Sequence, residues 1–378
     1  MRKIDRGELD PRCPVRRDAD GVWRIQDHAT AREFLRHNDT RQAGFGIEGA
    51  KRFNQGMRLA VLYRDGPEHR EHRRQTAKYF TPKRVDAAYR DLMHRLADEQ
   101  CARLRREKRV DLSELSFQLA VAVAGEVVGL TESRGSMAER LDRFFGTMPD
   151  PDARGLRAAR AGVRSLFTIG AFFLRDVRPA IAVRRKQRRD DLISHLIDDG
   201  CNDREILGEC VTFAAAGMVT TREFITVAAW HLFTDEALRE RYVAAEEKER
   251  FTILHEILRL EPVVADLLRW TTEDVRLGGV TIPEGDLVDV SVAAANTDET
   301  VVGAEPERVC PDRPAGDAVL SFGDGPHRCP GAYIAIQETD IFLSRLFAMP
   351  GLRMVRTPAV RIRPEIAAYE LTGLMLEV

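Results

Sequence analysis

The chain has 378 residues, of which 44% are hydrophobic and 31% are charged, with a formal net charge of −2. This composition is typical of a globular protein, and the balanced charge argues against binding to nucleic acid or an acidic membrane through bulk charge. The N-terminal sequence MRKIDRGELDPRCPV contains no apolar run, so we expect no signal peptide and a cytoplasmic protein.

Six cysteines are scattered along the chain, and no two of them are spaced as a CxxC pair. They are residues 13, 101, 201, 210, 310 and 329. Disulfide frameworks and zinc modules are recognised by regular cysteine spacing, so we expect neither here. Five of the six are interpreted as ordinary free thiols, and Cys329 is set apart by its neighbours.

Helical patterns dominate the first two thirds of the chain. Residues 20–45 indicate a short strand followed by a helix, and residues 66–107 indicate a basic helical region that breaks at Pro82. Nearly all of residues 111–260 follow a helical pattern. Within that region, residues 205–233 are apolar on all sides, which predicts a long helix through the interior of the protein.

Strand patterns are confined to three shorter regions, at about residues 20–30, 262–295 and 352–378. The second of these contains a Gly-Gly turn and a Pro-Glu-Gly turn between alternating apolar residues. We therefore predict a mostly α protein with a smaller β region (α+β), organised as one domain over residues 1–378.

The sequence FGDGPHRCPG, residues 322–331, is the most distinctive stretch of the chain. Its positions follow the spacing F-G-x-G-x-H-x-C-x-G, with Phe322, Gly323, Gly325, His327, Cys329 and Gly331. Glycines let the backbone approach a metal-bound sulfur closely and turn its N–H groups toward it. The apolar residues that follow Gly331 predict a helix whose positive N-terminal end lies behind the Cys329 thiolate.

This loop resembles the haem-binding loop of the cytochrome P450 family. The resemblance implies a haem b cofactor (iron protoporphyrin IX) with Cys329 as the axial iron ligand. It also implies the triangular-prism fold of that family, with the haem buried between the long interior helix and the helix after the cysteine.

Three further segments agree with the resemblance. The sequence HEILRLEP places Glu256 and Arg259 like the structural ExxR pair of the family, which a downstream arginine completes; Arg308 and Arg313 are both candidates. In the segment DGPEHREHRR, His69 and Arg73 resemble a clamp for a haem propionate, and Arg269 resembles a second propionate partner.

One segment departs from the family pattern. In AAGMVTT, residues 215–221, Ala216, Gly217 and Thr220 match, but Val219 stands where the family usually has an acid that helps to deliver protons. The leading interpretation is a monooxygenase that hydroxylates or epoxidises its substrate, with protons supplied through Thr220 and water or a polar group of the substrate. A minor role for Glu223 stays open.

The valine at position 219 leaves other interpretations open. One is an atypical oxidation, such as C–C or C–O coupling or ring formation. Another is a non-catalytic haem-binding sensor. Peroxide-driven oxidation ranks lowest, because the only nearby arginine, Arg222, lies beyond Thr220.

The resemblance also implies partners. These are O2, a mid-sized natural-product-like substrate, and electrons from a separate ferredoxin or flavodoxin with its reductase, since the chain shows no flavin or pyridine-nucleotide motif. We expect a monomer that binds neither nucleic acid nor membrane. Basic residues suited to an acidic electron donor are Arg70, Arg73, Arg74, Lys78, Lys83, Arg84 and Arg328. Substrate contacts are expected from residues 46–62, 145–172, 211–220 and 263–268.

Overall fold

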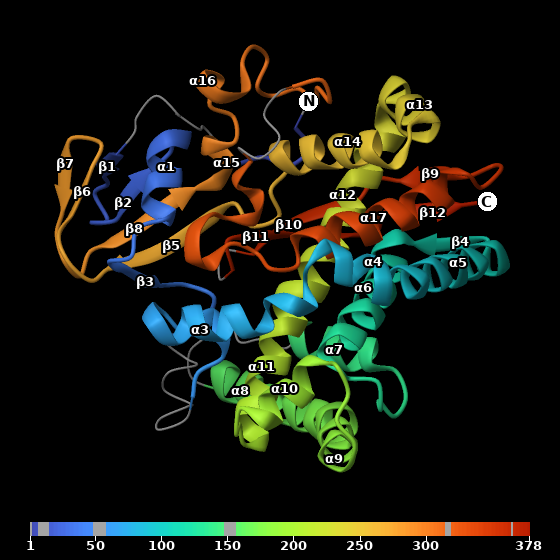
Figure 1. Ribbon diagram of the computed structural model, residues 1–378. Coiled ribbons are helices and arrows are strands. Elements are labelled where there is room, and N and C mark those ends of the chain that lie inside the picture. The colour runs from blue at the N-terminus through green and yellow to red at the C-terminus, as the bar shows by residue number, and fades with distance from the viewer. Residues whose placement is uncertain (1, 7–14, 48–57, 147–155, 314–318, 364–365) are drawn as a thin grey trace.

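The computed structural model describes residues 2–6, 15–47, 58–146, 156–313, 319–363 and 366–378. Helices make up most of it, and the strands gather at one side and along the C-terminal region (Figure 1). None of the helices in these ranges is long and apolar enough to cross a membrane. The predicted mostly α fold with a smaller β part is confirmed.

The helices follow the predicted order. Their bounds are α1 His28–Leu35, α3 Gly66–Thr76, α4 Pro82–Ala88, α5 Arg90–Glu107, α6 Leu112–Val128, α7 Met137–Gly146, α8 Leu156–Phe172, α9 Arg178–Lys186, α10 Leu192–Asp198, α11 Asp203–Phe213, α12 Thr220–Thr234, α13 Glu236–Ala244, α14 Glu247–Leu260, α15 Val292–Ala295, α16 Glu299–Val302 and α17 Ala332–Phe347. Two π-helical segments, η3 Phe173–Val177 and η4 Ala214–Val219, continue α8 and α11. Pro82 is the first residue of α4, where Thr81 caps the helix, so the expected break is present.

The strands form four small sheets. Their bounds are β1 Val15–Arg17, β2 Trp23–Ile25, β3 Thr40–Gln42, β4 Arg109–Asp111, β5 Asp266–Thr271, β6 Val275–Leu277, β7 Val280–Ile282, β8 Leu287–Ser291, β9 Arg353–Arg356, β10 Ala359–Arg363, β11 Ala368–Thr372 and β12 Met375–Glu377. The largest sheet has the order β1-β2-β8-β5-β3, with β2 and β8 parallel and the other pairs antiparallel. The N-terminal strands therefore pair with strands about 260 residues further along the chain.

The predicted interior helix is present as a continuous run from Asp203 to Thr234, with the π-helical segment η4 at its centre. Asn202 and Glu205 close its N-terminus with a capping box. The helix packs against α6, α14 and α17 (Figure 1). Its burial explains why the sequence is apolar on all sides.

Candidate functional site

The cysteine loop is a tight turn between η6 Leu320–Phe322 and α17. The backbone N–H of Cys329 donates to the Phe322 carbonyl at 2.8 Å, which closes the loop on itself. Because α17 begins at Ala332, the N–H of Gly331 lies at the start of the helix and donates to the Cys329 sulfur. Burial raises the pKa of the Cys329 thiol, while this N–H and the charges of Arg73 and Arg328 oppose the shift.

Gly325 is the position in this loop where no residue other than glycine fits. Its φ is +66°, and a Cβ at this position would lie 2.3 Å from the carbonyl oxygen of Leu35 at the end of α1. Its neighbour Asp324 accepts from Arg32 and Arg36 of the same helix, at 2.9 and 3.0 Å. The loop is therefore clamped to α1 by a close backbone approach and two ion pairs.

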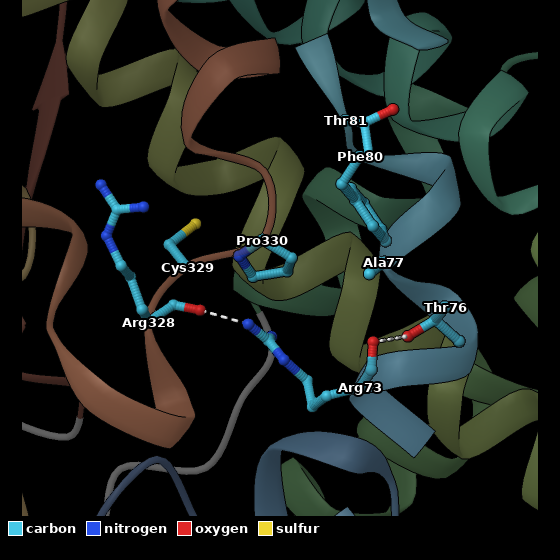
Figure 2. A pocket seen from close by; sticks show the side chains of 8 residues that line it. All are labelled: Arg73, Thr76, Ala77, Phe80, Thr81, Arg328, Cys329 and Pro330. Atoms are coloured by element: carbon cyan, nitrogen blue, oxygen red, sulfur yellow. Dashed lines mark hydrogen bonds between the residues drawn. The ribbon is translucent and has the colours of Figure 1, made fainter. Parts of the chain in front are cut away.

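Figure 2 shows a shallow pocket beside the cysteine. The side chain of Arg73 reaches across it and donates to the backbone carbonyl of Arg328, while Cys329 points to the other side. Phe80 and Thr81 close the pocket opposite. This contact joins the α3 region to the cysteine loop, two segments separated by more than 250 residues.

A larger cavity of about 610 Å³ lies between the cysteine loop and the interior helix. Ala215 and Ala216 are solvent-accessible although they lie in the middle of the chain's central helix, because they face this cavity. Thr220 lines it too, and its hydroxyl donates to the Ala216 carbonyl at 2.5 Å. The cavity volume falls within the roughly 300–1,000 Å³ that is usual for cofactor and small-ligand sites.

Gly217 also lines the cavity, but it is not required there by contact with neighbours. A Cβ would meet only the Cβ of Ala124, at 3.9 Å. The widening of the helix at this point comes from the π-helical segment η4, which the sequence pattern did not predict.

Three basic side chains line the cavity at its edge: His69, Arg73 and Arg269. We call these three the cavity cations. His69 stacks on His327 with ring centroids 4.1 Å apart. Among the described residues, the side chains of the two arginines donate to backbone carbonyls, Arg269 to Leu268 at 2.8 Å and Arg73 to Arg328. Burial lowers the pKa of Arg269 to about 10 and that of His69 to about 3.

The only acid beside the cavity cations in the described chain is Asp65. Its carboxylate already accepts from His327 at 2.9 Å and from the N–H of Gln42. The buried guanidinium of Arg269 and the half-buried one of Arg73 therefore lack carboxylate partners of their own, which is costly unless an anionic ligand provides them. A haem fits these residues, because its propionates are two carboxylates and Cys329 supplies a thiolate across the same cavity.

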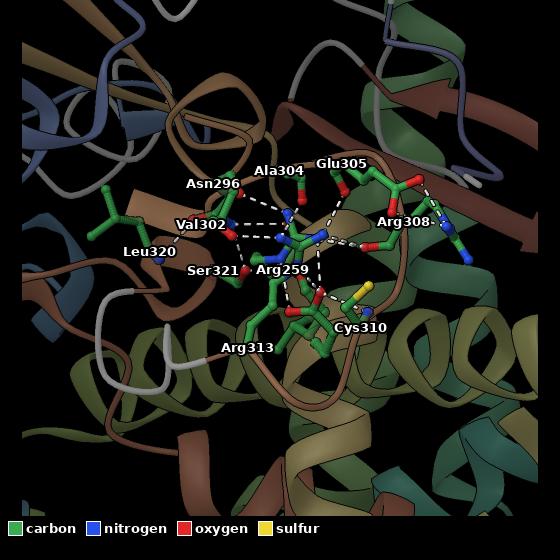
Figure 3. A network of polar contacts seen from close by, with 12 residues as sticks. Arg259, Asn296, Val302, Ala304, Glu305, Arg308, Cys310, Arg313, Leu320 and Ser321 are labelled. Atoms are coloured by element: carbon green, nitrogen blue, oxygen red, sulfur yellow. Dashed lines mark hydrogen bonds and ion pairs between the residues drawn. The ribbon is translucent and has the colours of Figure 1, made fainter. Parts of the chain in front are cut away.

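The ExxR residues form a separate, fully paired network (Figure 3). Arg259 donates to both Glu256 oxygens, at 2.8 and 2.9 Å, and Arg313 donates to Glu256 at 2.9 Å. Arg259 also reaches the carbonyls of Asn296 and Arg308. We call Glu256, Arg259 and Arg313 the Glu256 network.

Of the two arginines proposed to complete this network, Arg313 does so and Arg308 does not. The Arg308 side chain is exposed and pairs with Glu305 at 2.8 Å, so it contributes only its backbone carbonyl. The sequence left both arginines open as candidates for this role, and the structure favours Arg313. The two arginines lie five residues apart in an irregular loop, and only the fold decides which one faces inward.

The other expected positions are distributed as follows. Phe322, Gly323, His327 and Gly331 line the cavity, and Phe322 also lies edge-on to His255. Of the expected substrate segments, residues 48–57 and 147–155 lie outside the described residues, and the described parts contribute Val61, Leu62, Phe145, Val211, Val263 and Leu267 to the cavity wall. In the described ranges the remaining cysteines, residues 101, 201, 210 and 310, are free, and Cys13 lies outside those ranges.

One acidic residue of the cavity, Glu338, was not predicted by the sequence analysis. Glu338 of α17 is buried and lines the cavity, and burial raises the pKa of its carboxyl to about 8. Both carboxylate oxygens of Glu223, a candidate for a minor role in proton delivery, already accept hydrogen bonds. Arg222 donates to one oxygen at 2.7 Å, and the N–H of Leu371 donates to the other at the same distance. The helix α17 buries two acids, Glu338 and Asp340, and acids within this largely apolar sequence were the available signal.

A family model described as Cytochrome P450 matches residues 252–349, which include the Glu256 network and the cysteine loop. The erythromycin C-12 hydroxylase of Saccharopolyspora erythraea is 31% identical over 372 residues, covering 94% of this chain and 89% of the hydroxylase. The mycinamicin IV hydroxylase/epoxidase of Micromonospora griseorubida is 28% identical and covers 78% of this chain and 73% of that enzyme.

Solved structures agree with these sequence matches. A mutant of P450 EryK in complex with erythromycin B superposes with a TM-score of 0.76 at 26% identity, covering 97% of this chain and 93% of that one. CalO2 superposes with a TM-score of 0.80 at 25% identity, covering 96% and 92%.

Proposed function

This chain belongs to the cytochrome P450 family and is a haem-thiolate monooxygenase, and we propose that it hydroxylates or epoxidises a mid-sized natural product. When bound, the haem activates O2 and transfers one oxygen atom to the substrate. The observation that carries the proposal is the cavity itself. It has a thiol with an N–H donor on one side, the Thr220 hydroxyl directly after the π-helical segment on the other, and arginines without carboxylate partners along its wall.

The proposed cofactor is haem b, and each residue is assigned to the part of it that the residue would contact. Cys329 would bind the iron through its sulfur, and the glycine loop would shield that sulfur and supply its hydrogen bond from the Gly331 N–H. The cavity cations pair with the propionates, assisted by His327. Phe322, Gly323 and Gly331 line the face next to the sulfur. The Glu256 network serves folding rather than chemistry.

Proton delivery relies on Thr220 because Val219 cannot ionise. The Thr220 hydroxyl lies on the cavity wall and can pass a proton between water and the oxygen being reduced. Its donation to Ala216 holds the side chain in place, and Gly217 and Ala216 leave room for water beside it. A polar group on the substrate is the second source of protons in this proposal.

The substrate class, the electron donor and the oligomeric state are proposed from the same family membership. The cavity wall is mostly apolar, and two of the relatives are named as an erythromycin C-12 hydroxylase and a mycinamicin IV hydroxylase/epoxidase, so we propose a polyketide-like, peptide-derived or aromatic substrate. A separate ferredoxin or flavodoxin supplies the electrons at the basic surface near Arg328. The chain is proposed to act as a monomer and as one domain over residues 1–378.

The first test is the CO-difference spectrum of the reduced protein beside a Cys329→Ala variant. We expect the Soret band typical of thiolate ligation in the parent and its loss in the variant. Turnover with surrogate redox partners and isotopically labelled O2 should then place one labelled oxygen atom in the product. A histidine-type band in both proteins would contradict the proposal.

A further inference from the structure

The helix α8 and the π-helical segment η3 expose several large apolar side chains. Val163 is 68% exposed, Leu166 56%, Phe167 80% and Leu174 56%. Elsewhere in the described ranges the large exposed apolar residues are only Val243, Val355, Val360 and Ile362. An exposed apolar cluster of this kind marks an interaction surface more often than a scatter of single residues does.

Four exposed arginines lie among these apolar residues. They are Arg160, Arg164, Arg175 and Arg178, and none of them forms an ion pair with a described residue. On the next helix, by contrast, Arg184 pairs with Asp191 and Arg185 with Asp203. Residues 156–190 contain ten arginines and lysines but only two acids, within a chain whose net charge is −2. This surface is therefore an isolated basic and apolar region.

The helical spacing brings both kinds of side chain onto one face. Within α8, Arg160, Val163, Arg164 and Phe167 are three, four and seven positions apart and therefore lie on one side of the helix. Leu174, Arg175 and Arg178 follow in and after the π-helical segment and are exposed as well, so the run of alternating arginines and apolar groups continues there. We call this face the α8 stripe: Arg160, Val163, Arg164, Phe167, Leu174, Arg175 and Arg178. At about 1.5 Å per residue it extends roughly 27 Å, the length of a helix of five turns.

We propose that the α8 stripe docks a small acidic protein through an amphipathic helix whose carboxylates meet the four arginines and whose apolar residue packs on Phe167. The partner is distinct from the electron donor. No stripe residue lines the large cavity or the pocket beside Cys329. This inference does not depend on which substrate the cavity binds.

The composition of the stripe favours this partner over two others. A second copy of the chain would bring the same unpaired arginines against each other, and like charges oppose such pairing. A membrane-surface helix separates a continuous apolar face from its basic face, whereas here arginines and apolar residues alternate on one side.

The test uses the full-length, haem-loaded protein and a defined probe. The probe is a fluorescein-labelled helical peptide of 20 residues with glutamates flanking one leucine face, beside a matched peptide with glutamine for glutamate. Fluorescence anisotropy at low salt measures binding to the parent, to Phe167→Glu and to Arg160→Glu/Arg164→Glu. Val243→Glu, on the exposed side of α13, is the matched control.

We expect the glutamate peptide to bind the parent and the Val243→Glu control equally, and both stripe variants at least about tenfold more weakly. The glutamine peptide should bind no better than the stripe variants do. Equal binding to all four proteins would overturn the proposal.

Three other outcomes would also overturn it. The first is sedimentation as a dimer that Phe167→Glu abolishes, with no peptide binding. The second is Phe167-dependent binding to phosphatidylglycerol vesicles but not to the peptide. The third is slower reduction of Phe167→Glu by a surrogate ferredoxin, which would assign the stripe to the electron donor.

Discussion

The Glu256 network and the cavity cations differ in whether their charges are paired with other charges of the chain. In the Glu256 network, every charged group has a charged partner, because Glu256 receives both Arg259 and Arg313. Among the cavity cations, Arg73 and Arg269 donate to backbone carbonyls, and the nearby Asp65 already receives His327. The first cluster is complete within the chain, whereas the second needs an anion from outside.

The comparison offers a way to separate folding residues from binding residues. A buried charge that is already paired stabilises the fold only while its partners remain, and removing one of them leaves an uncompensated charge. A buried cation without a carboxylate partner destabilises the cofactor-free protein, and an anionic ligand compensates for this charge when it binds. Variants of the two clusters should therefore act on different states of the protein.

The largest effect is expected at the centre of the paired network. Glu256→Ala leaves two buried arginines unpaired, so the free energy of unfolding should fall by about 3–5 kcal/mol, with or without cofactor. Denaturant unfolding of both forms measures this. Changing Glu256 and Arg259 together to leucine and methionine should recover part of the loss, and no recovery would contradict the pairing argument.

A smaller and opposite effect is expected at Arg269. Arg269→Leu removes a buried charge, so the cofactor-free protein should be as stable as the parent or more so. Loss of a charged hydrogen bond to a propionate, worth about 1.5–3 kcal/mol, should release haem roughly ten- to hundredfold faster. Haem transfer to an excess of apomyoglobin measures that rate. A destabilised cofactor-free protein would place Arg269 with the folding residues instead.

The third prediction concerns pH. Burial lowers the pKa of His69 to about 3, below its ordinary value of 6.5, so the unfolded chain binds the proton more readily. Stability of the cofactor-free protein should therefore fall as pH drops from about 6.5 to 3, by at most about 1.4 kcal/mol per pH unit.

A bound propionate favours the charged imidazole, so the haem-loaded protein should show a shallower dependence on pH. His69→Gln should remove the difference between the two forms. Identical slopes in the cofactor-free and loaded parent would show that no anion reaches His69.

The smallest effect is expected at Arg308. Its exposed side chain pairs with Glu305 on the surface, where solvent screens the attraction, so Arg308→Ala should leave the free energy of unfolding nearly unchanged. Arg313→Ala, tested in parallel by the same denaturant titration, should cost several times more. Equal effects would mean that the two arginines share the role.

Much of this site could be predicted from local sequence. The cysteine loop, the ExxR pair and the His69–Arg73 spacing are each contained in one short segment, where residue order alone fixes which side chains are near neighbours. The choice between Arg308 and Arg313 could not be made, because it depends on how an irregular loop returns to α14.

The π-helical segment η4 was also unpredictable, since apolar residues around Gly217 fit an α-helix equally well. Glu223 illustrates a third limit. Its spacing from Thr220 suggested a shared face, but the backbone of β11 holds its carboxylate, and that strand lies almost 150 residues further along. Contacts of this range come from tertiary structure, which short spacing patterns do not record.

The order of strands in the largest sheet has a consequence for how the protein is made. β1 and β2 pair with each other, but β2 also pairs with β8 (Trp23 with Val288) and β3 with β5 (Thr40 with Thr271), partners that are made only 231 to 265 residues later. At about 5–20 residues per second, that interval is roughly 13–50 s of exposure for these edges. The N-terminal strands can therefore join the rest of the largest sheet only late in synthesis. We expect the helices of residues 66–260 to form the first folded unit.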